Sequence, residues 1–194
     1  LGGIKDLEEI SDSLLSDIEV ILLNHIDSES YDSLYHFFTI IEKHPEVNWS
    51  ISVLERLKDY LKKTKLDTLD KFSKIENLED YARQSYSTLR GYGIHALDKL
   101  IIASPNSIPY FKDTIYSLAA DRNNYVRFNS IFLITTVLEI DKEFAKELFE
   151  IVFTGDERML AHWNSNYIMY RFYDDYKDKI QGLLQLGFNS NDKL

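Results

Sequence analysis

Residues 121–134 read DRNNYVRFNSIFLI and contain the clearest fold signal in the chain. The first four residues favour a turn, because short polar side chains hydrogen-bond to nearby backbone and tolerate turn angles. The apolar residues that follow recur at helical spacing, so the stretch predicts a turn and then a helix over 125–139. Residues 163–169 read WNSNYIM, which matches FNSIFLI at 128–134 in its aromatic, Asn-Ser and apolar positions at an offset of 35.

A third copy of this pattern precedes the other two. At an offset of 37, Leu89-Arg90 and Gly93 align with Val126-Arg127 and Ser130. A period of this length is typical of stacked helical hairpins, since one hairpin cannot cover its own apolar face and its neighbours cover it. The sequence therefore predicts an all-α fold, an α-solenoid of helical hairpins, with repeats at about 77–120, 121–153 and 156–189.

Apolar residues at spacings of three, four and seven predict helices along the rest of the chain. Polar residues suited to helix N-caps precede several of them, including Ser50, Asn77 and Asp141. The predicted helices cover residues 4–24, 31–43, 51–63, 77–103, 108–120, 144–153 and 158–173, with a last helix that follows Asp174 and ends near Gly187.

Residues 1–76 lack the repeat period. They either continue the solenoid irregularly or form a separate helical cap, and the missing period favours the cap. Residues 190–194 are predicted to be a frayed tail, as chain ends usually are.

The segment Asp121 to Arg127 resembles the inter-repeat signature of HEAT repeats. In that family an Asp and an Arg pair between successive turns while a Val packs inside. The resemblance covers about residues 86–189 and implies a structural ladder that includes Asp121, Arg127 and, in the next repeat, Asp156. The third repeat departs from the pattern, because Ala161-His162 stands where Val-Arg is expected.

A narrower resemblance involves residues 89–97 and 140–149. These segments look like the C-terminal helical region of some large bacterial STAND-type, NACHT-like ATPases, where such a region recognises a protein ligand. The chain has no Gly-x-x-x-x-Gly-Lys-Ser/Thr loop, so the resemblance places any ATPase outside it. The chain begins at Leu1 rather than Met, which is compatible with a larger parent protein.

Composition narrows the class of partner. The formal net charge is −10, which disfavours nucleic acid, because phosphate binding needs clustered Lys and Arg, but permits a basic protein partner. The longest apolar runs, 18–23 and 131–138, are far shorter than the roughly 20 residues that a membrane span needs. The absence of cysteine removes disulfides and thiolate chemistry and fits a reducing, cytoplasmic location.

No arrangement of residues in the sequence is typical of catalysis. The five histidines include no pair four residues apart, as a zinc-binding helix would need, and no Gly-x-Ser-x-Gly segment occurs. Adjacent acids such as Asp174-Asp175 point about 100° apart on a helix and suit capping better than acid–base work. The sequence therefore predicts no enzyme activity, no metal site and no cofactor.

Aromatic residues near the C-terminus are the candidate binding site. Trp163, Tyr167 and Tyr170 are spaced by four and three, with Arg171 and Tyr173 beside them. These rings either pack between the last two hairpins or form a binding patch. Trp, Tyr and Arg are the residue types enriched at interface hot spots, which supports the second interpretation.

Three functions are compatible with these observations. The first, which we favour, is a non-enzymatic protein–protein interaction module, a recognition or scaffold domain; the NACHT-like resemblance implies a larger defence ATPase as one parent protein for it. The second is a small acidic immunity protein that inhibits a basic toxin, since opposite charge speeds association. The third is a HEAT-like enzyme resembling the alkylpurine DNA glycosylases, which the acidity of the chain disfavours.

Overall fold

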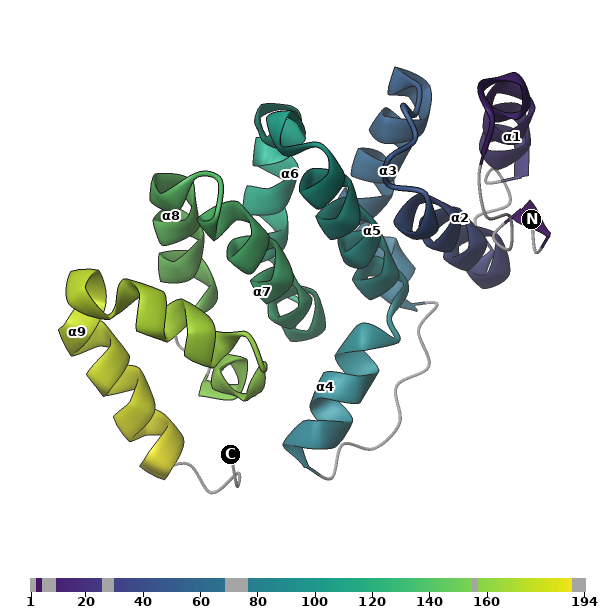
Figure 1. Ribbon diagram of the computed structural model, residues 1–194. Coiled ribbons are helices and arrows are strands. Elements are labelled where there is room, and N and C mark those ends of the chain that lie inside the picture. Colours follow the sequence, from purple (N-terminus) through teal and green to yellow (C-terminus); the bar gives the residue numbers. More distant parts are fainter. Residues whose placement is uncertain (1–2, 5–9, 26–29, 69–76, 155–156, 190–194) are drawn as a thin grey trace. The chain divides into compact units, whose positions relative to one another are not determined.

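The computed structural model describes residues 3–4, 10–25, 30–68, 77–154 and 157–189 (Figure 1). Helices and connecting turns make up these residues and no β-strand occurs among them, which confirms the predicted all-α class. They divide into two compact units. The α2–α5 unit lies within residues 1–71 and 88–114, and the α7–α9 unit lies within residues 72–87 and 115–194. In the described ranges, no helix has both the length and the apolar content that a membrane crossing requires.

The α2–α5 unit combines the N-terminal helices with a helix from the middle of the chain. Its elements are α1 (Asp12–His25), α2 (Tyr31–Lys43), α3 (Ile51–Lys62), the 3-10 helix η3 (Thr64–Thr68), α5 (Leu89–Ala103), the 3-10 helix η4 (Pro105–Ser107) and the first part of α6 (Ile108–Ala119). The predicted helices over 31–43 and 51–63 are confirmed as α2 and α3. α2 and α5 lie side by side (Figure 1), and the core that they share with α3 contains Phe37, Phe38, Tyr60, Leu61 and Ile94.

Gly93 allows the close approach of three helices in this unit. A Cβ atom built at Gly93 on α5 would lie 2.9 Å from Leu61 Cδ2 on α3 and 3.1 Å from Phe38 Cε1 on α2. Leu61 and Phe38 are fully buried, so neither side chain has free space into which it can move. Glycine is unfavourable in a helix interior by about 1 kcal/mol relative to alanine, and here it is required by packing.

Replacing Gly93 with valine is expected to lower the free energy of unfolding by about 1–3 kcal/mol, because extra methyl groups must displace a packed core. Urea unfolding followed by circular dichroism measures the change. Gly182→Val on α9 is the matched control, since a Cβ atom at Gly182 meets nothing within 4 Å. The control substitution should leave stability unchanged or raise it slightly. Equal losses in both variants would contradict the packing argument.

The single long helix predicted over 77–103 is interrupted in the structure. The structure has two helices there, α4 (Leu78–Tyr86) and α5. Asn77 caps α4 as expected, with its Oδ1 accepting the Asp80 N–H at 2.9 Å. Thr88 is extended, and its hydroxyl accepts the Gly91 N–H at 2.9 Å, so it starts a new helix. The prediction of a single helix was wrong because apolar residues recur at helical spacing on both sides of Thr88. The periodicity therefore does not reveal a break that depends on one capping residue.

The α7–α9 unit contains α4, the end of α6, α7 (Asn124–Leu138), α8 (Lys142–Val152), the 3-10 helix η5 (Glu157–Ala161) and α9 (Ser165–Asn189). α7 and α8 form a helical hairpin around a core that includes Val126, Phe128, Ile134, Phe144 and Phe149. Asp141 caps α8 as predicted, because its Oδ1 accepts the Phe144 N–H at 3.0 Å.

The last helices begin and end at different residues from those predicted. A helix over 158–173 was expected, but residues 157–161 form η5 and α9 starts only at Ser165. α9 then continues past Asp174 and bends at Tyr176, whose φ of −134° and ψ of 33° are not helical. Consequently FNS at 128–130 lies inside α7, whereas the matching WNS at 163–165 spans the turn before α9 and its first residue.

Candidate functional site

Trp163 lies in a tight turn between η5 and α9. The turn is held by the Ser165 N–H, which donates to the His162 carbonyl at 2.8 Å, and by the Ser165 hydroxyl, which donates to the Met159 carbonyl at 2.7 Å. Ser165 and Met159 are fully buried. The backbone under the indole is therefore fixed by buried hydrogen bonds, although the indole itself is exposed.

Four rings from three elements meet at this turn, and we call them the aromatic cluster: Tyr86 on α4, Phe132 on α7, and His162 and Trp163. The Trp163 and Tyr86 rings stack with centroids 4.7 Å apart and planes 3° apart. Phe132 approaches Trp163 edge-on at 5.1 Å and His162 at 4.6 Å. His162 is buried, while Trp163 remains 54% exposed. Such ring pairs add about 0.5–1.5 kcal/mol beyond burial, so the exposed indole is held in one orientation.

A second group of side chains gathers on the first turns of α9. Glu139, just after the end of α7, accepts hydrogen bonds from the Tyr167 hydroxyl at 2.5 Å and from Arg171 Nη1 at 2.6 Å. The Arg171 guanidinium also lies over the Tyr167 ring, 5.5 Å from its centroid. We call these three residues the Glu139 network.

The Glu139 network has defined protonation states. The hydrogen bond from Tyr167, and after it that from Arg171, holds the pKa of Glu139 below its usual value. The same hydrogen bond to Glu139 raises the pKa of Tyr167. Glu139 is thus ionised and Tyr167 protonated at neutral pH, so the surface presents a neutralised Arg171–Glu139 pair and an aromatic ring.

The remaining two candidate residues are also on the surface of α9. Tyr170 is 80% exposed and Tyr173 is 40% exposed, and the buried side of this helix is formed instead by Ile168, Met169 and Phe172. The Tyr173 hydroxyl accepts a hydrogen bond from Gln181 Nε2 at 3.4 Å, which spans the bend at Tyr176.

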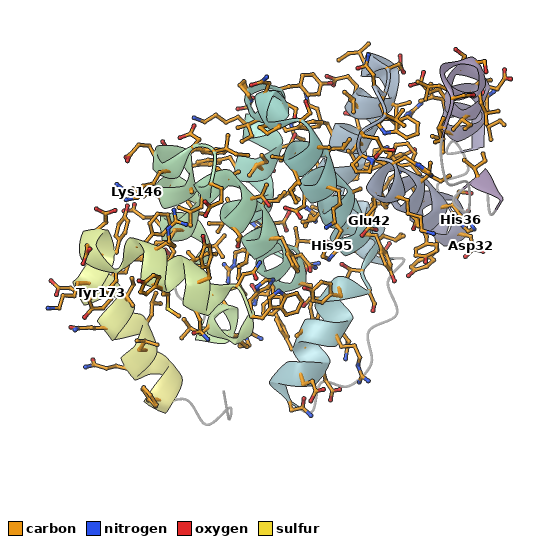
Figure 2. All side chains as sticks on the ribbon, viewed as in Figure 1. Asp32, His36, Glu42, His95, Lys146 and Tyr173 are labelled. Atoms are coloured by element: carbon orange, nitrogen blue, oxygen red, sulfur yellow. The ribbon has the colours of Figure 1, made fainter. Side chains whose placement is uncertain are left out.

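Two lysines of α8 contact α9 beside its bend. Asp175 binds Lys142 Nζ at 3.2 Å and Lys146 Nζ at 3.3 Å. Hydrogen bonds from these lysines, Lys142 first, lower the pKa of the Asp175 carboxyl, which therefore stays ionised at neutral pH. Tyr173 and Lys146, which Figure 2 labels, thus belong to elements that are joined directly.

All five candidate residues predicted from the sequence are therefore exposed, and we call Trp163, Tyr167, Tyr170, Arg171 and Tyr173 the aromatic surface. In the structure Trp163 packs against Tyr86 and Phe132 in the aromatic cluster, and Tyr167 and Arg171 donate hydrogen bonds to Glu139. The sequence did not indicate Tyr86, Phe132 or Glu139 as site residues, because these side chains reach the site through helix packing and share no spacing with it. His162 directly precedes Trp163 in the sequence, but its contact with the Phe132 ring arises only from the packing of α7.

The structure describes two of the three ladder residues suggested by the HEAT resemblance, Asp121 and Arg127. Asp121 Oδ1 accepts the Asn123 N–H at 2.8 Å within the turn before α7. Arg127 is half-buried on α7, and Asp156 lies outside the described residues. α4 and α7 are joined by a different side chain, Asn129, whose Nδ2 donates to the Ser85 carbonyl at 2.5 Å and to the Tyr125 carbonyl at 3.1 Å.

No known protein family, curated protein or solved structure matches this chain significantly. The resemblances to HEAT repeats and to NACHT-like ATPases therefore stay predictions. Within the described ranges, no cluster of three or more histidines and acids is arranged so that it could hold a metal ion.

Proposed function

We propose that this chain is a protein-binding module, a solenoid of HEAT-like helical hairpins, and that its aromatic surface binds a basic protein partner. The observation that carries the proposal is the state of Trp163. Its backbone is fixed by buried hydrogen bonds and its ring is stacked on Tyr86, yet more than half of its surface is exposed. A large ring held rigid before binding loses little conformational entropy when a partner covers it.

The chemistry around Trp163 fits a protein partner better than a small ligand. Tyr170 and Tyr173 add exposed ring area on the same element that begins beside Trp163. Arg171 is already neutralised by Glu139, so its burial under a partner would not strand a lone charge. Tyrosine and tryptophan bury apolar area while their polar atoms keep hydrogen bonds, which is why both are common at interfaces.

The net charge indicates the kind of partner. At −10 the chain attracts basic proteins and speeds their association, and it repels nucleic acid. A recognition or scaffold role in a larger defence ATPase is compatible with this charge.

Replacing Trp163 with alanine is expected to weaken partner binding by about 30-fold or more, as the loss of a central aromatic hot spot typically does. The partner is recovered by affinity capture on the wild-type chain and purified, and its affinity is measured by calorimetry. Tyr170→Ala is a second variant, whose ring is 80% exposed and whose loss leaves the core intact. Tyr116→Ala on α6 is the matched control, because this ring is 48% exposed and lies outside the aromatic surface.

Fluorescence gives an independent reading. The chain has two tryptophans, and Trp49 is buried, so Trp163 alone reports on the surface in a Trp49→Phe background. Partner binding should move its emission to shorter wavelength as the indole leaves water. Unchanged emission on binding, with full affinity in both alanine variants, would refute the proposed surface.

A further inference from the structure

The turn that carries Trp163 is closed by a histidine side chain. His162 Nδ1 accepts the Asn164 N–H at 3.1 Å, so this hydrogen bond spans Trp163. Asn164 is the residue before α9, and its carbonyl accepts the Ile168 N–H at 3.0 Å as the helix begins. One imidazole nitrogen therefore connects the residues on either side of the indole at the start of the helix that carries Tyr170.

The turn before α7 contains the same kind of hydrogen bond with a different acceptor. There Asp121 Oδ1 accepts the Asn123 N–H at 2.8 Å, again from a side chain to the N–H two residues on. A carboxylate can accept throughout the neutral pH range, but an imidazole cannot accept once it is protonated, because both of its nitrogens are then donors. The turn before α9 thus depends on an acceptor that one proton removes.

The ring of His162 is buried against other rings. Its centroid lies 4.9 Å from that of Phe128, 4.6 Å from that of Phe132 and 4.6 Å from that of Trp163. Because Nδ1 accepts a hydrogen bond, the neutral ring carries its proton on Nε2. A second proton must go to Nδ1, where it faces the Asn164 N–H and sets two donors against each other.

Titratable groups from three elements reach the rings around His162, directly or through Tyr81. Tyrosines are uncharged at neutral pH, arginine keeps its positive charge, and burial raises the pKa of Tyr125 further. The inward side of α9 is apolar. These groups therefore bring no negative charge that would stabilise an imidazolium. In the described part of the chain they are Tyr81 and Tyr86 of α4, Tyr125 of α7 and Arg158 of η5.

We infer that His162 positions Trp163 for the protein partner only while its Nδ1 is unprotonated, so that the aromatic surface binds at neutral pH and releases its partner in acid. A donor left facing a donor in a buried turn costs the equivalent of roughly 5- to 150-fold in an equilibrium constant. Affinity falls in proportion to the fraction of molecules whose turn is closed. One proton is involved, so the loss is at most about tenfold for each pH unit. The inference rests on the proposed function for its partner.

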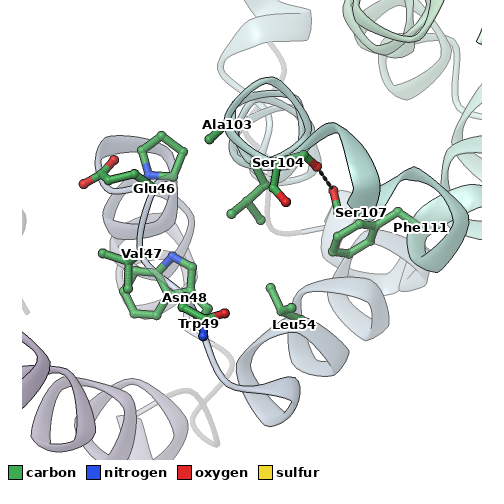
Figure 3. Close-up of a pocket in the computed structure, with 11 residues that line it drawn as sticks. Glu46, Val47, Asn48, Trp49, Leu54, Ala103, Ser104, Ser107 and Phe111 are labelled. Atoms are coloured by element: carbon green, nitrogen blue, oxygen red, sulfur yellow. Dashed lines mark hydrogen bonds between the residues drawn. The ribbon is translucent and has the colours of Figure 1, made fainter. Parts of the chain in front are cut away.

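The first test needs only the free chain. The Asn164 amide and the Trp163 indole resonances are followed by NMR from neutral pH through the ordinary histidine pKa of about 6.5, as far as circular dichroism shows an unchanged fold. Both should move along one titration curve, with faster solvent exchange of the Asn164 amide in acid. Trp49 gives a reference indole in the other unit, where it lines a cavity beside the end of α5 (Figure 3) and donates to the His44 carbonyl at 3.1 Å.

His162→Asn separates the hydrogen bond from the titration. An asparagine Oδ1 can accept the N–H two residues on, as Asn123 does from the Tyr125 N–H at 3.0 Å, and it does not titrate. This variant should hold the Trp163 resonance constant as the pH falls. His162→Gln, whose oxygen lies one bond further from the backbone, should not restore the turn. His36→Gln on α2 is the matched control and should titrate like the wild type.

The second test uses the captured partner. The affinity of the wild type should fall by about tenfold or more in acid, while that of His162→Asn stays constant. An Asn164 amide that does not move while the fold is intact, or an acid response of His162→Asn equal to that of the wild type, would overturn the inference. The proposed function would survive either result, because the Trp163→Ala and Tyr170→Ala variants test it at neutral pH.

Discussion

Replacing Arg90 with alanine is expected to lower the free energy of unfolding by about 3–5 kcal/mol, the range for losing one partner of a buried ion pair. Arg90, on the first turn of α5, is 1% exposed. Its Nε donates to the Leu61 carbonyl at 3.1 Å, and its Nη1 lies 3.3 Å from Asp67 Oδ2. The alanine variant leaves a buried carbonyl and a half-buried carboxylate without these donors, and it also leaves a void.

Arg83→Ala is the matched control for Arg90. Arg83 also pairs with an aspartate, Asp80, at 2.5 Å, but its side chain is 74% exposed. Exposed pairs contribute about 0–1 kcal/mol, so urea unfolding should show at most that loss. Arg90→Lys keeps the charge without the planar fork of donors and should give an intermediate loss. A loss below about 1 kcal/mol in Arg90→Ala would show that water replaces the guanidinium at little cost.

The second large effect is a loss of stability in acid caused by His95. Burial on α5, and then the charge of Lys99, lowers the pKa of His95 from 6.5 to about 4. The unfolded chain therefore binds a proton at His95 at a higher pH than the folded chain does. The His95 contribution to stability is complete above pH 6.5 and is lost as the pH falls toward about 4. Each pKa unit corresponds to 1.36 kcal/mol, so the loss amounts to about 3 kcal/mol.

The measurement compares urea unfolding of the wild type and of His95→Gln across this pH range. The difference between the two curves should grow in favour of the variant as the pH falls from 6.5 to about 4. A difference that stays constant with pH would contradict a depressed pKa. Groups that titrate in the same way in both proteins contribute equally to the two free energies of unfolding, so their contributions cancel in the difference.

Glu42, on the neighbouring helix α2, opposes this trend. Burial raises the pKa of Glu42. The charges of Lys99 and Lys43 partly offset this rise, and the charge of Asp98 adds to it. A carboxyl with a raised pKa favours folding while it is protonated, so its contribution is present in acid and is lost as the pH rises. Both side chains are labelled in Figure 2, and α2 and α5 pack together. The stability of Glu42→Gln itself, measured against the wild type over the same pH range, should therefore fall more steeply in acid.

The aromatic surface offers exposed rings and a neutralised Arg171–Glu139 pair, so the part of a partner that it suits is an apolar or aromatic segment.

The sequence by itself determined the local structure of this protein. Ser30, Ser50, Asn77 and Asp141 each stand immediately before a helix, and three of these side chains, all but that of Ser50, make the N-cap hydrogen bond. Caps and helical periodicity act over a few residues, so they can be recognised without knowledge of the fold. The same local rules missed the start at Thr88 and extended a helix through Trp163, because apolar spacing continues across both turns.

Tertiary structure alone decided how these helices combine and which side chains are exposed. Arg90 belongs to the same Leu-Arg pattern as Val126-Arg127, yet it is buried because Leu61 and Asp67, distant in sequence, supply acceptors for its donors. Trp163 is exposed because the Ser165 hydrogen bonds end η5 and turn the indole onto Tyr86. Burial and the pairing of buried polar groups are properties of packed neighbours, and the neighbours of α4 and α5 lie in different units of the chain.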